Sequence, residues 1–169
     1  MTLGKAFGNG FPLSGLLTTN EISQAKPWGI PSGSSSSYGS NPLGAAAGAA
    51  ALRIIDEERL TENAAAVGGV MLRELETFVD RYPFVGFVQG AGLLIRMELV
   101  RDRKTKEPVA KALTQALYQE CLRRGLVAMT YTTPIRINPP LVIAEETALE
   151  GLAILDEALE VVLREHGLQ

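Results

Sequence analysis

Lys5 is the residue whose surroundings most directly indicate chemistry. It lies in Leu3–Gly15, which has the sequence LGKAFGNGFPLSG. The glycines of this stretch leave room for another group to approach the backbone closely. A lysine held in such a place can lose its proton and attack a carbonyl carbon, which gives a Schiff base. The stretch therefore predicts a lysine nucleophile, and the competing interpretation is a surface lysine near a flexible chain end.

Further along the chain, a loop rich in small hydroxyl side chains precedes a predicted helix. The serine run Ser34–Ser37 leads into Tyr38–Leu43, in which Asn41 suits the cap of a helix and Pro42 its first turn. Small hydroxyl groups followed by a helix start are suited to a phosphate. A Schiff-base lysine together with a phosphate site predicts pyridoxal 5'-phosphate as the cofactor. The competing interpretation of the serine run is a flexible linker.

Three stretches resemble motifs of the class III aminotransferases, the ornithine and 4-aminobutyrate type of pyridoxal-phosphate enzyme. Leu3–Gly15 is similar to the cofactor-lysine segment, Ser37–Leu43 to the T-[YF]-x-[GA]-N-P-[LM] motif, and Pro134–Ile143 to the late V-[LI]-R-x-x-P-P-L-x-[IL] motif. They occur in the order of the family, and together they are specific although each alone is weak. The resemblance implies an α/β chain of the PLP-dependent transferase fold type I, of which this sequence resembles only the C-terminal portion.

The resemblance implies roles for four residues. Lys5 would carry the cofactor and move a proton between the substrate α-carbon and the cofactor C4′ atom. Ser37 takes the position of a threonine that contacts the cofactor phosphate, and the neighbouring Ser36 is the alternative. Arg136 takes the position of the arginine that clamps the substrate carboxylate, for which a guanidinium fork is suited because it donates two parallel hydrogen bonds. The competing interpretation of Arg136 is a structural salt bridge.

These roles predict transfer of an amino group from an amino acid or amine to a 2-oxo acid, as part of a longer aminotransferase chain. Two alternatives stay open. An aminomutase, racemase or decarboxylase of the same fold shares the motifs, since pocket geometry decides which bond breaks at the α-carbon. The second alternative is a fragment that is inactive by itself. In the family, the residues that stack on the cofactor ring and pair with its nitrogen precede these motifs. The family also implies a homodimer, in which the phosphate contact crosses the subunit interface.

Composition argues against several other classes of function. The 169 residues are 46% hydrophobic and 21% charged, which is ordinary for a globular protein. The net charge of −3, without a block of basic residues, gives no reason to expect a nucleic-acid or membrane partner. No apolar run approaches the roughly 20 residues that span a bilayer. The single cysteine, Cys121, fits a reducing compartment and hence a cytoplasmic protein, and no residues stand at metal-ligand spacing around His166.

Hydrophobic periodicity predicts the elements that must position these residues. The expected helices are 41–52, about 58–81, 109–124 and 145–163, and the expected strands are 11–19, 93–99, 127–131 and 135–137, with loops over 26–41 and 101–107. For the domains we expect three parts. Residues 1–56 would be the end of the large cofactor-binding domain, residues 57–82 a long connecting helix, and residues 83–169 the small α/β domain.

Overall fold

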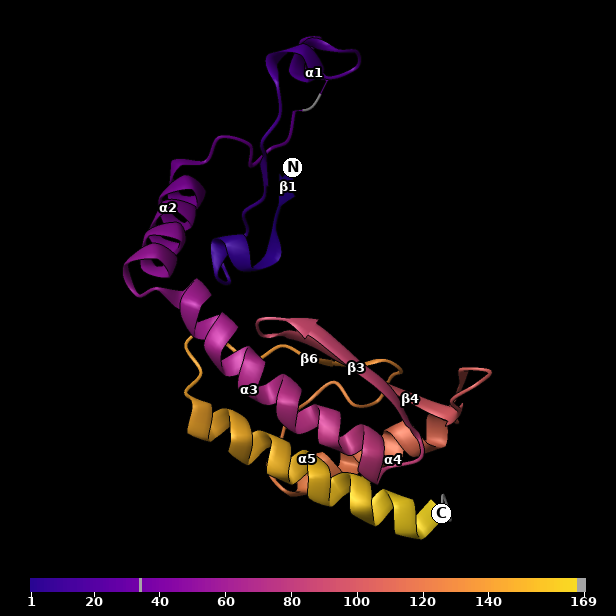
Figure 1. Cartoon of the computed structure of the whole chain (residues 1–169). Helices are drawn as coiled ribbons and strands as arrows, with labels where there is room; N and C mark the ends of the chain where they lie inside the picture. The colour runs from indigo at the N-terminus through magenta and orange to yellow at the C-terminus, as the bar shows by residue number, and fades with distance from the viewer. Residues whose placement is uncertain (34, 167–169) are drawn as a thin grey trace. The chain divides into compact units, whose positions relative to one another are not determined.

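The computed structural model describes residues 1–33 and 35–166 and divides into two compact units, Met1–Arg59 and Leu60–Gln169 (Figure 1). The first unit has short elements and one long helix. They are β1 (Thr2–Leu3), a 3-10 helix η1 (Lys5–Gly8), β2 (Gly15–Leu16), α1 (Asn20–Gln24) and α2 (Pro42–Glu57). β1 pairs with β2 in antiparallel fashion, so η1 lies in the loop that this pair closes.

The long helix of the first unit, α2, begins where the sequence predicts. The Asn41 side chain accepts a hydrogen bond from the backbone N–H of Leu43 at 2.9 Å, and Pro42 is the first helical residue. Glycines on one face let the helix approach the segment after η1, since a β-carbon on Gly48 would lie 2.4 Å from Leu13 Cδ2. Two glycines of this helix, Gly44 and Gly48, therefore serve close packing, whereas most of its alanines are exposed.

The strand expected over 11–19 is shorter than predicted, because only Gly15–Leu16 finds a partner strand. The short helix α1, which the sequence analysis did not predict, follows it. Its N-terminal cap is Thr19, whose side-chain oxygen accepts a hydrogen bond from the backbone N–H of Ile22 at 3.4 Å.

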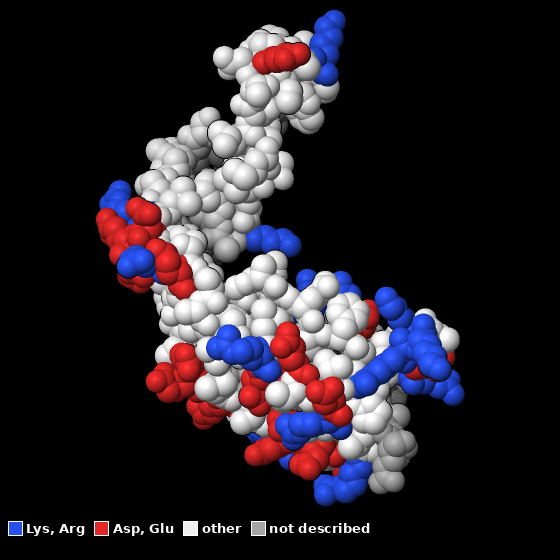
Figure 2. All heavy atoms as spheres, in the orientation of Figure 1, with Lys and Arg blue, Asp and Glu red and all other residues white. Residues whose placement is uncertain are grey.

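The first unit has almost no side-chain core. In the described part of the chain, every buried apolar side chain lies at or after Leu60. The buried residues before that point are Gly8, Gly44 and Gly48. Large apolar side chains such as Leu16 and Trp28 are exposed, and Figure 2 shows little charge on the visible surface of this unit away from the end of α2. Burial of apolar side chains therefore contributes little to the stability of this unit by itself.

The second unit is an antiparallel sheet with helices packed against it. Its elements are α3 (Leu60–Arg81), β3 (Val85–Ala91), β4 (Leu94–Asp102), β5 (Glu107–Pro108), α4 (Lys111–Arg123), β6 (Ile135–Ile137) and α5 (Glu145–His166). β4 is the central strand and pairs with β3, β5 and β6. α3 packs against β3 and β4, and α5 packs against α3 and α4 (Figure 1). None of the described helices is both long enough and apolar enough to cross a membrane.

The buried faces of these elements match the predicted periodicity. On α3 the residues that step by three or four are buried, among them Val67, Met71 and Leu75. On β4, Ile95 and Met97 are buried whereas the intervening Arg96 is half-exposed. Alternate side chains of a strand point to opposite faces of the sheet, so β4 has one apolar face and one polar face.

Several elements of the second unit differ from those expected. The strand expected over 127–131 is reduced to a single bridge between Met129 and Arg136, because β6 is only three residues long and offers no continuous ladder. The helix expected from about residue 58 begins at Leu60 instead, since Arg59 has φ +52 and Glu58 caps the end of α2. β3 was not predicted at all, and it is joined to β4 by a tight turn at Gly92, which has φ +54.

The end of α3 is fastened by side chains from other elements. The Arg103 guanidinium, in the hairpin between β4 and β5, donates to the backbone carbonyls of Val79, Tyr82 and Val85. The Tyr82 hydroxyl donates to the Asp156 carboxylate of α5 at 2.6 Å. The last carbonyl groups of a helix lack partners within the helix, so Arg103 supplies the donors that α3 needs there.

Candidate active site

Lys5 is the first residue of η1, and its backbone adopts a left-handed conformation with φ +54. Its side chain is exposed. A residue other than glycine in this conformation costs on the order of 1–3 kcal/mol, and such residues cluster at catalytic and ligand-binding sites. The lysine that the sequence singled out is therefore also a backbone outlier, held between the paired strands β1 and β2.

A cavity of about 280 Å³ lies beside the start of α2. Phe11–Ser14 lines it on the side of the chain that follows η1, and Ser36, Gly39 and the first turn of α2 line it as well. A β-carbon on Gly39 would lie 3.1 Å from Ser36 Oγ. Glycine at this position therefore keeps the space beside the Ser36 hydroxyl open. A helix N-terminus with a neighbouring hydroxyl is suited to an anion.

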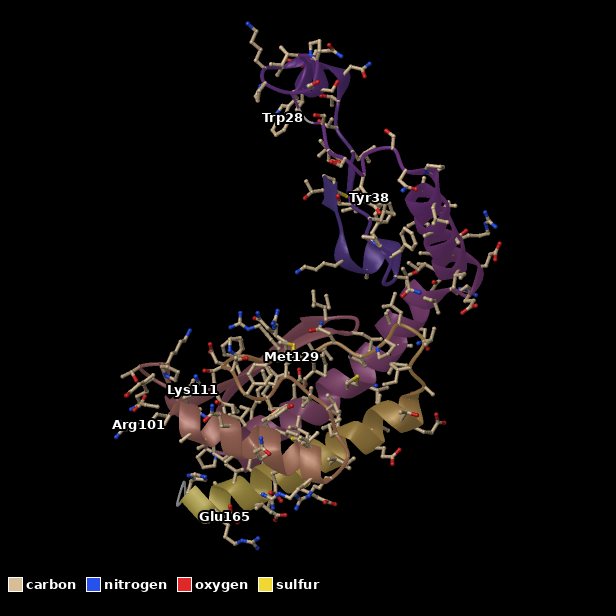
Figure 3. All side chains as sticks on the ribbon, turned by 180° about the vertical axis from the view of Figure 1, so that it is seen from behind. Trp28, Tyr38, Arg101, Lys111, Met129 and Glu165 are labelled. Carbon is tan, nitrogen blue, oxygen red and sulfur yellow. The ribbon has the colours of Figure 1, made fainter. Side chains whose placement is uncertain are left out.

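The two candidate serines are placed differently with respect to this cavity. Both are exposed in the same loop, but only Ser36 lines the cavity. Tyr38, which follows them and is labelled in Figure 3, lines the cavity although its side chain is 75% exposed. Lys5 belongs to the same unit but lies outside the cavity wall. The structure thus brings Ser36 to the start of α2 and leaves Lys5 in the adjoining loop.

Arg136 lies in the second unit, in the middle of β6. Its flanking residue Ile135 is completely buried, whereas Arg136 is exposed on the opposite face of the sheet. Its guanidinium contacts the sulfur of Met129 at 3.9 Å, and within residues 1–33 and 35–166 it forms no ion pair with a carboxylate (Figure 3 labels Met129). The structural salt bridge that competed with a binding role is therefore absent from the described residues.

A second arginine, which the sequence analysis did not single out, lies opposite Arg136. The antiparallel register of β4 and β6 pairs Arg96 with Arg136. The Arg96 guanidinium lies 3.3 Å from a Glu98 carboxylate oxygen and 5.1 Å from the centre of the Phe87 ring. Polar alternation along β4 is visible in the sequence, but the partner of Arg96 depends on a strand register that no local pattern gives.

The remaining reactive residues do not form a second site. Cys121 is completely buried on α4, and burial raises the pKa of its thiol to about 11, so it stays protonated at neutral pH. Cys121 is therefore a core residue and not a nucleophile. His166 is exposed at the end of α5. Among the described residues no three histidine, cysteine or acidic side chains are grouped so that they could hold a metal ion.

Comparison with known proteins gives a consistent result. The family model "Aminotransferase class-III" matches residues 1–159. The human mitochondrial alanine–glyoxylate aminotransferase 2 is 33% identical over 162 residues, which are 94% of this chain and 31% of that protein. The ethanolamine-phosphate phospho-lyase homolog 1 of Caenorhabditis elegans is 30% identical over 167 residues, which are 97% of this chain and 35% of that protein.

Solved structures resemble the chain over nearly its whole length. An amine transaminase from an uncultivated Pseudomonas species, solved in a PLP-bound form, has a TM-score of 0.86 at 29% identity and covers 95% of this chain and 38% of its own. An (S)-enantioselective omega-transaminase from Thermomicrobium roseum has a TM-score of 0.79 at 31% identity over 97% of this chain and 36% of its own. The chain spans about a third of the length of the proteins it matches. Since the family model covers nearly all of its residues, the chain belongs to the class III aminotransferases.

Proposed function

We propose that this chain is part of a pyridoxal-phosphate-dependent aminotransferase, which transfers an amino group from an amino acid or amine to a 2-oxo acid. The observation that carries the proposal is Lys5, a lysine in the cofactor-lysine motif whose backbone is held at φ +54. Membership of the class III family and the likeness to transaminase structures support the same reaction. Because the chain spans about a third of its relatives, we propose that it acts within a longer chain.

The residues present fit the cofactor. The cavity at the start of α2 offers the Ser36 hydroxyl and the positive end of a helix dipole to a phosphate, and Gly39 keeps the space beside that hydroxyl open. We propose that Ser36, with Ser37 as the neighbouring donor, binds the phosphate group. When bound, pyridoxal phosphate supplies an electron sink for the substrate α-carbon.

Lys5 and Arg136 would have different roles in the reaction. We propose that the amino group of Lys5 would hold the cofactor through its aldehyde group and that, when free, it would move a proton at the substrate α-carbon. Arg136 orients the substrate by its carboxylate, because its fork donates two parallel hydrogen bonds and stays charged. Positioning of this kind converts binding energy into rate.

The domain roles and the assembly are also proposals. We propose that 1–56 is the end of a large cofactor-binding domain, that 57–82 connects it to a small α/β domain, and that 83–169 forms this small domain. Exposed apolar side chains on the first unit, such as Leu43 and Leu52, support burial in a homodimer. A cytoplasmic location is proposed on the single unpaired Cys121.

A second candidate function is a lyase or another reaction of the same cofactor. A relative that is named a phospho-lyase homolog matches 97% of the chain, which supports a reaction other than transamination as the second candidate. The aminomutase, racemase and decarboxylase alternatives rest on the same reasoning. The products decide among them, since only transamination consumes one 2-oxo acid and forms another.

The test uses the 169-residue chain alone and the same chain preceded by the N-terminal part of a transaminase that it resembles. Each is incubated with pyridoxal phosphate, reduced with borohydride and digested for peptide mapping, with Lys5→Ala and Lys26→Ala as paired variants. We expect the label on Lys5 in the longer protein and its loss in Lys5→Ala only. A label that stays in Lys5→Ala and maps to Lys26 or Lys111 would refute the assignment.

A further inference from the structure

Two arginines face each other across adjacent strands on the polar face of the sheet, and their guanidinium groups contact different neighbours, Phe87 for Arg96 and Met129 for Arg136. Arg96 of β4 and Arg136 of β6 are register partners in an antiparallel ladder. Such partners have β-carbons about 4.5–5.5 Å apart, and like charges at this spacing destabilise a sheet. A carboxylate bound between the two guanidinium groups would remove this repulsion, whereas water only screens it.

The surroundings of Arg96 hold its side chain in place without using all of its donors. One terminal nitrogen pairs with Glu98 at 3.3 Å, and the guanidinium lies over the Phe87 ring at 5.1 Å. The Nε atom is shielded from solvent and has no hydrogen-bond partner among the described residues. A buried donor without a partner costs about 1–3 kcal/mol, so an acceptor that reaches the Nε–H group would stabilise the side chain.

The charges of this group match a single carboxylate. Arg136 and Arg96 contribute two positive charges, and Glu98 contributes one negative charge, which leaves one positive charge uncompensated among these three residues. Arg136 itself has only the weak contact with Met129 at 3.9 Å. A monocarboxylate would neutralise the group, whereas a dianion would leave an excess negative charge.

We propose that Arg96 is a second carboxylate-binding residue, which holds the substrate carboxylate together with Arg136. Glu98 and Phe87 orient the Arg96 guanidinium, and Glu98 also competes with the substrate for it. This inference rests on the proposed role of Arg136 as the substrate arginine. It assigns to Arg96 a contact for which the sequence motifs gave no role.

The experiment measures carboxylate binding directly by NMR. The 169-residue chain is titrated with butyrate, and with butyramide as the uncharged control, while the Nε–H resonances of the arginines are followed. We expect the Arg96 and Arg136 resonances to shift with butyrate along one curve with one dissociation constant, and neither to shift with butyramide. A shift of Arg136 alone would overturn the proposal and leave the proposed function intact.

Variants separate a binding role from a structural one. Arg96→Gln should weaken butyrate binding by roughly tenfold or more, since a hydrogen bond to a charged group is lost. Arg96→Lys should weaken butyrate binding by a smaller factor, because the lysine keeps the positive charge and lacks only the two-pronged donor geometry of the guanidinium. Glu98→Gln should tighten binding because the competing carboxylate is gone, and Arg101→Gln, which removes an exposed arginine paired with Glu107, should change nothing.

Each outcome decides the matter. Binding by Arg96→Gln and Arg96→Lys that equals that of the unaltered chain would show that Arg96 is structural. Thermal unfolding of each variant checks that it is folded. If Arg96→Gln does not fold, the comparison is made with Arg96→Lys. If both arginines bind butyrate while Lys5 fails to carry the cofactor, the anion site stands and the proposed function falls.

Discussion

A β-carbon on Gly68 of α3 would lie 2.1 Å from the carbonyl oxygen of Gly92, in the turn between β3 and β4. The helix and the turn approach each other so closely that only hydrogen fits between them. Gly92 has φ +54, and a β-carbon there would lie 3.3 Å from the carbonyl oxygen of Ala64 on the same helix. The packing of α3 on the sheet therefore depends on two glycines that face each other.

Gly68→Ala should destabilise the second unit by about 1–3 kcal/mol, since backbone must move to admit the methyl group. The adjacent Gly69 is the control, because a β-carbon there would meet only the end of the Arg73 side chain at 3.6 Å. Gly69→Ala should stabilise by up to about 1 kcal/mol through helix propensity. Urea denaturation followed by circular dichroism measures both, and equal effects would contradict the close approach.

Arg103→Met should lower the free energy of unfolding by about 1–3 kcal/mol. The variant keeps the length of the side chain but leaves the carbonyls of Val79, Tyr82 and Val85 without their charged donor. Lys104→Met in the same hairpin is the control, as its side chain is exposed. Chemical denaturation compares the two, and a loss no larger than that of the control would mean that water replaces Arg103 at no cost.

Stability should fall as pH rises from about 9 to 11 because of Cys121. Burial raises the pKa of this thiol from 9.0 to about 11, so in this window the unfolded chain releases the proton while the native protein keeps it. The sign follows from linkage, and the loss is about 1.4 kcal/mol per pH unit at most. Below pH 9 both states are protonated and the full contribution is present.

Cys121→Ala isolates this effect from other groups that titrate in the same range. Burial and the bond to Asp156 also raise the pKa of Tyr82, so the unaltered chain loses stability above pH 10 from that residue too. We expect Cys121→Ala to be less stable at pH 8, because a cavity forms, but to lose less stability between pH 9 and 11. Parallel slopes for the two proteins would show that the thiol is not the titrating group.

Ser36→Ala should weaken cofactor binding more than Ser37→Ala does. Ser36 lines the cavity at the start of α2 and Ser37 does not. Removing a hydroxyl that donates to a phosphate should cost about 1.5–3 kcal/mol, which is roughly a tenfold to hundredfold loss of affinity. Absorbance titration of the longer protein with pyridoxal phosphate measures this. The reverse order would assign the phosphate contact to Ser37.

Arg136→Lys should raise the Michaelis constant for an amino acid by roughly tenfold or more and leave that for an amine without a carboxylate nearly unchanged. The variant keeps the charge and loses the bidentate fork. Steady-state kinetics on the longer protein with one substrate of each kind gives both constants. A similar rise for both substrates would identify Arg136 as a structural residue.

Local patterns predicted the elements whose determinants are local. Asn41 and Pro42 define the start of α2 through a cap and a missing N–H, and both effects operate within one turn. Ile95, Met97 and Leu99 alternate along β4, so its buried face was predictable without knowledge of its neighbours.

The predictions that were wrong concern elements that depend on contacts between residues distant in sequence. Val127 and Tyr131 suggested a strand, yet only Met129 forms a bridge there, because pairing is decided by β6 and not by the segment itself. The site shows the same division. Lys5 and Arg136 stand in motifs, whereas the position of Arg96 opposite Arg136 follows from the β4–β6 register.

The register of β6 also constrains how this sequence can change over time. Ile135 is buried, Arg136 lies on the polar face, and Ile137 packs partly against the core. Inserting or deleting one residue within the strand would exchange arginine for isoleucine on both faces at once. The residue opposite Arg96 can therefore change by point substitution without disturbing the rest of β6, but not by insertion or deletion. Differences in length between relatives are expected instead between Gly125 and Pro134, where the backbone forms a single bridge.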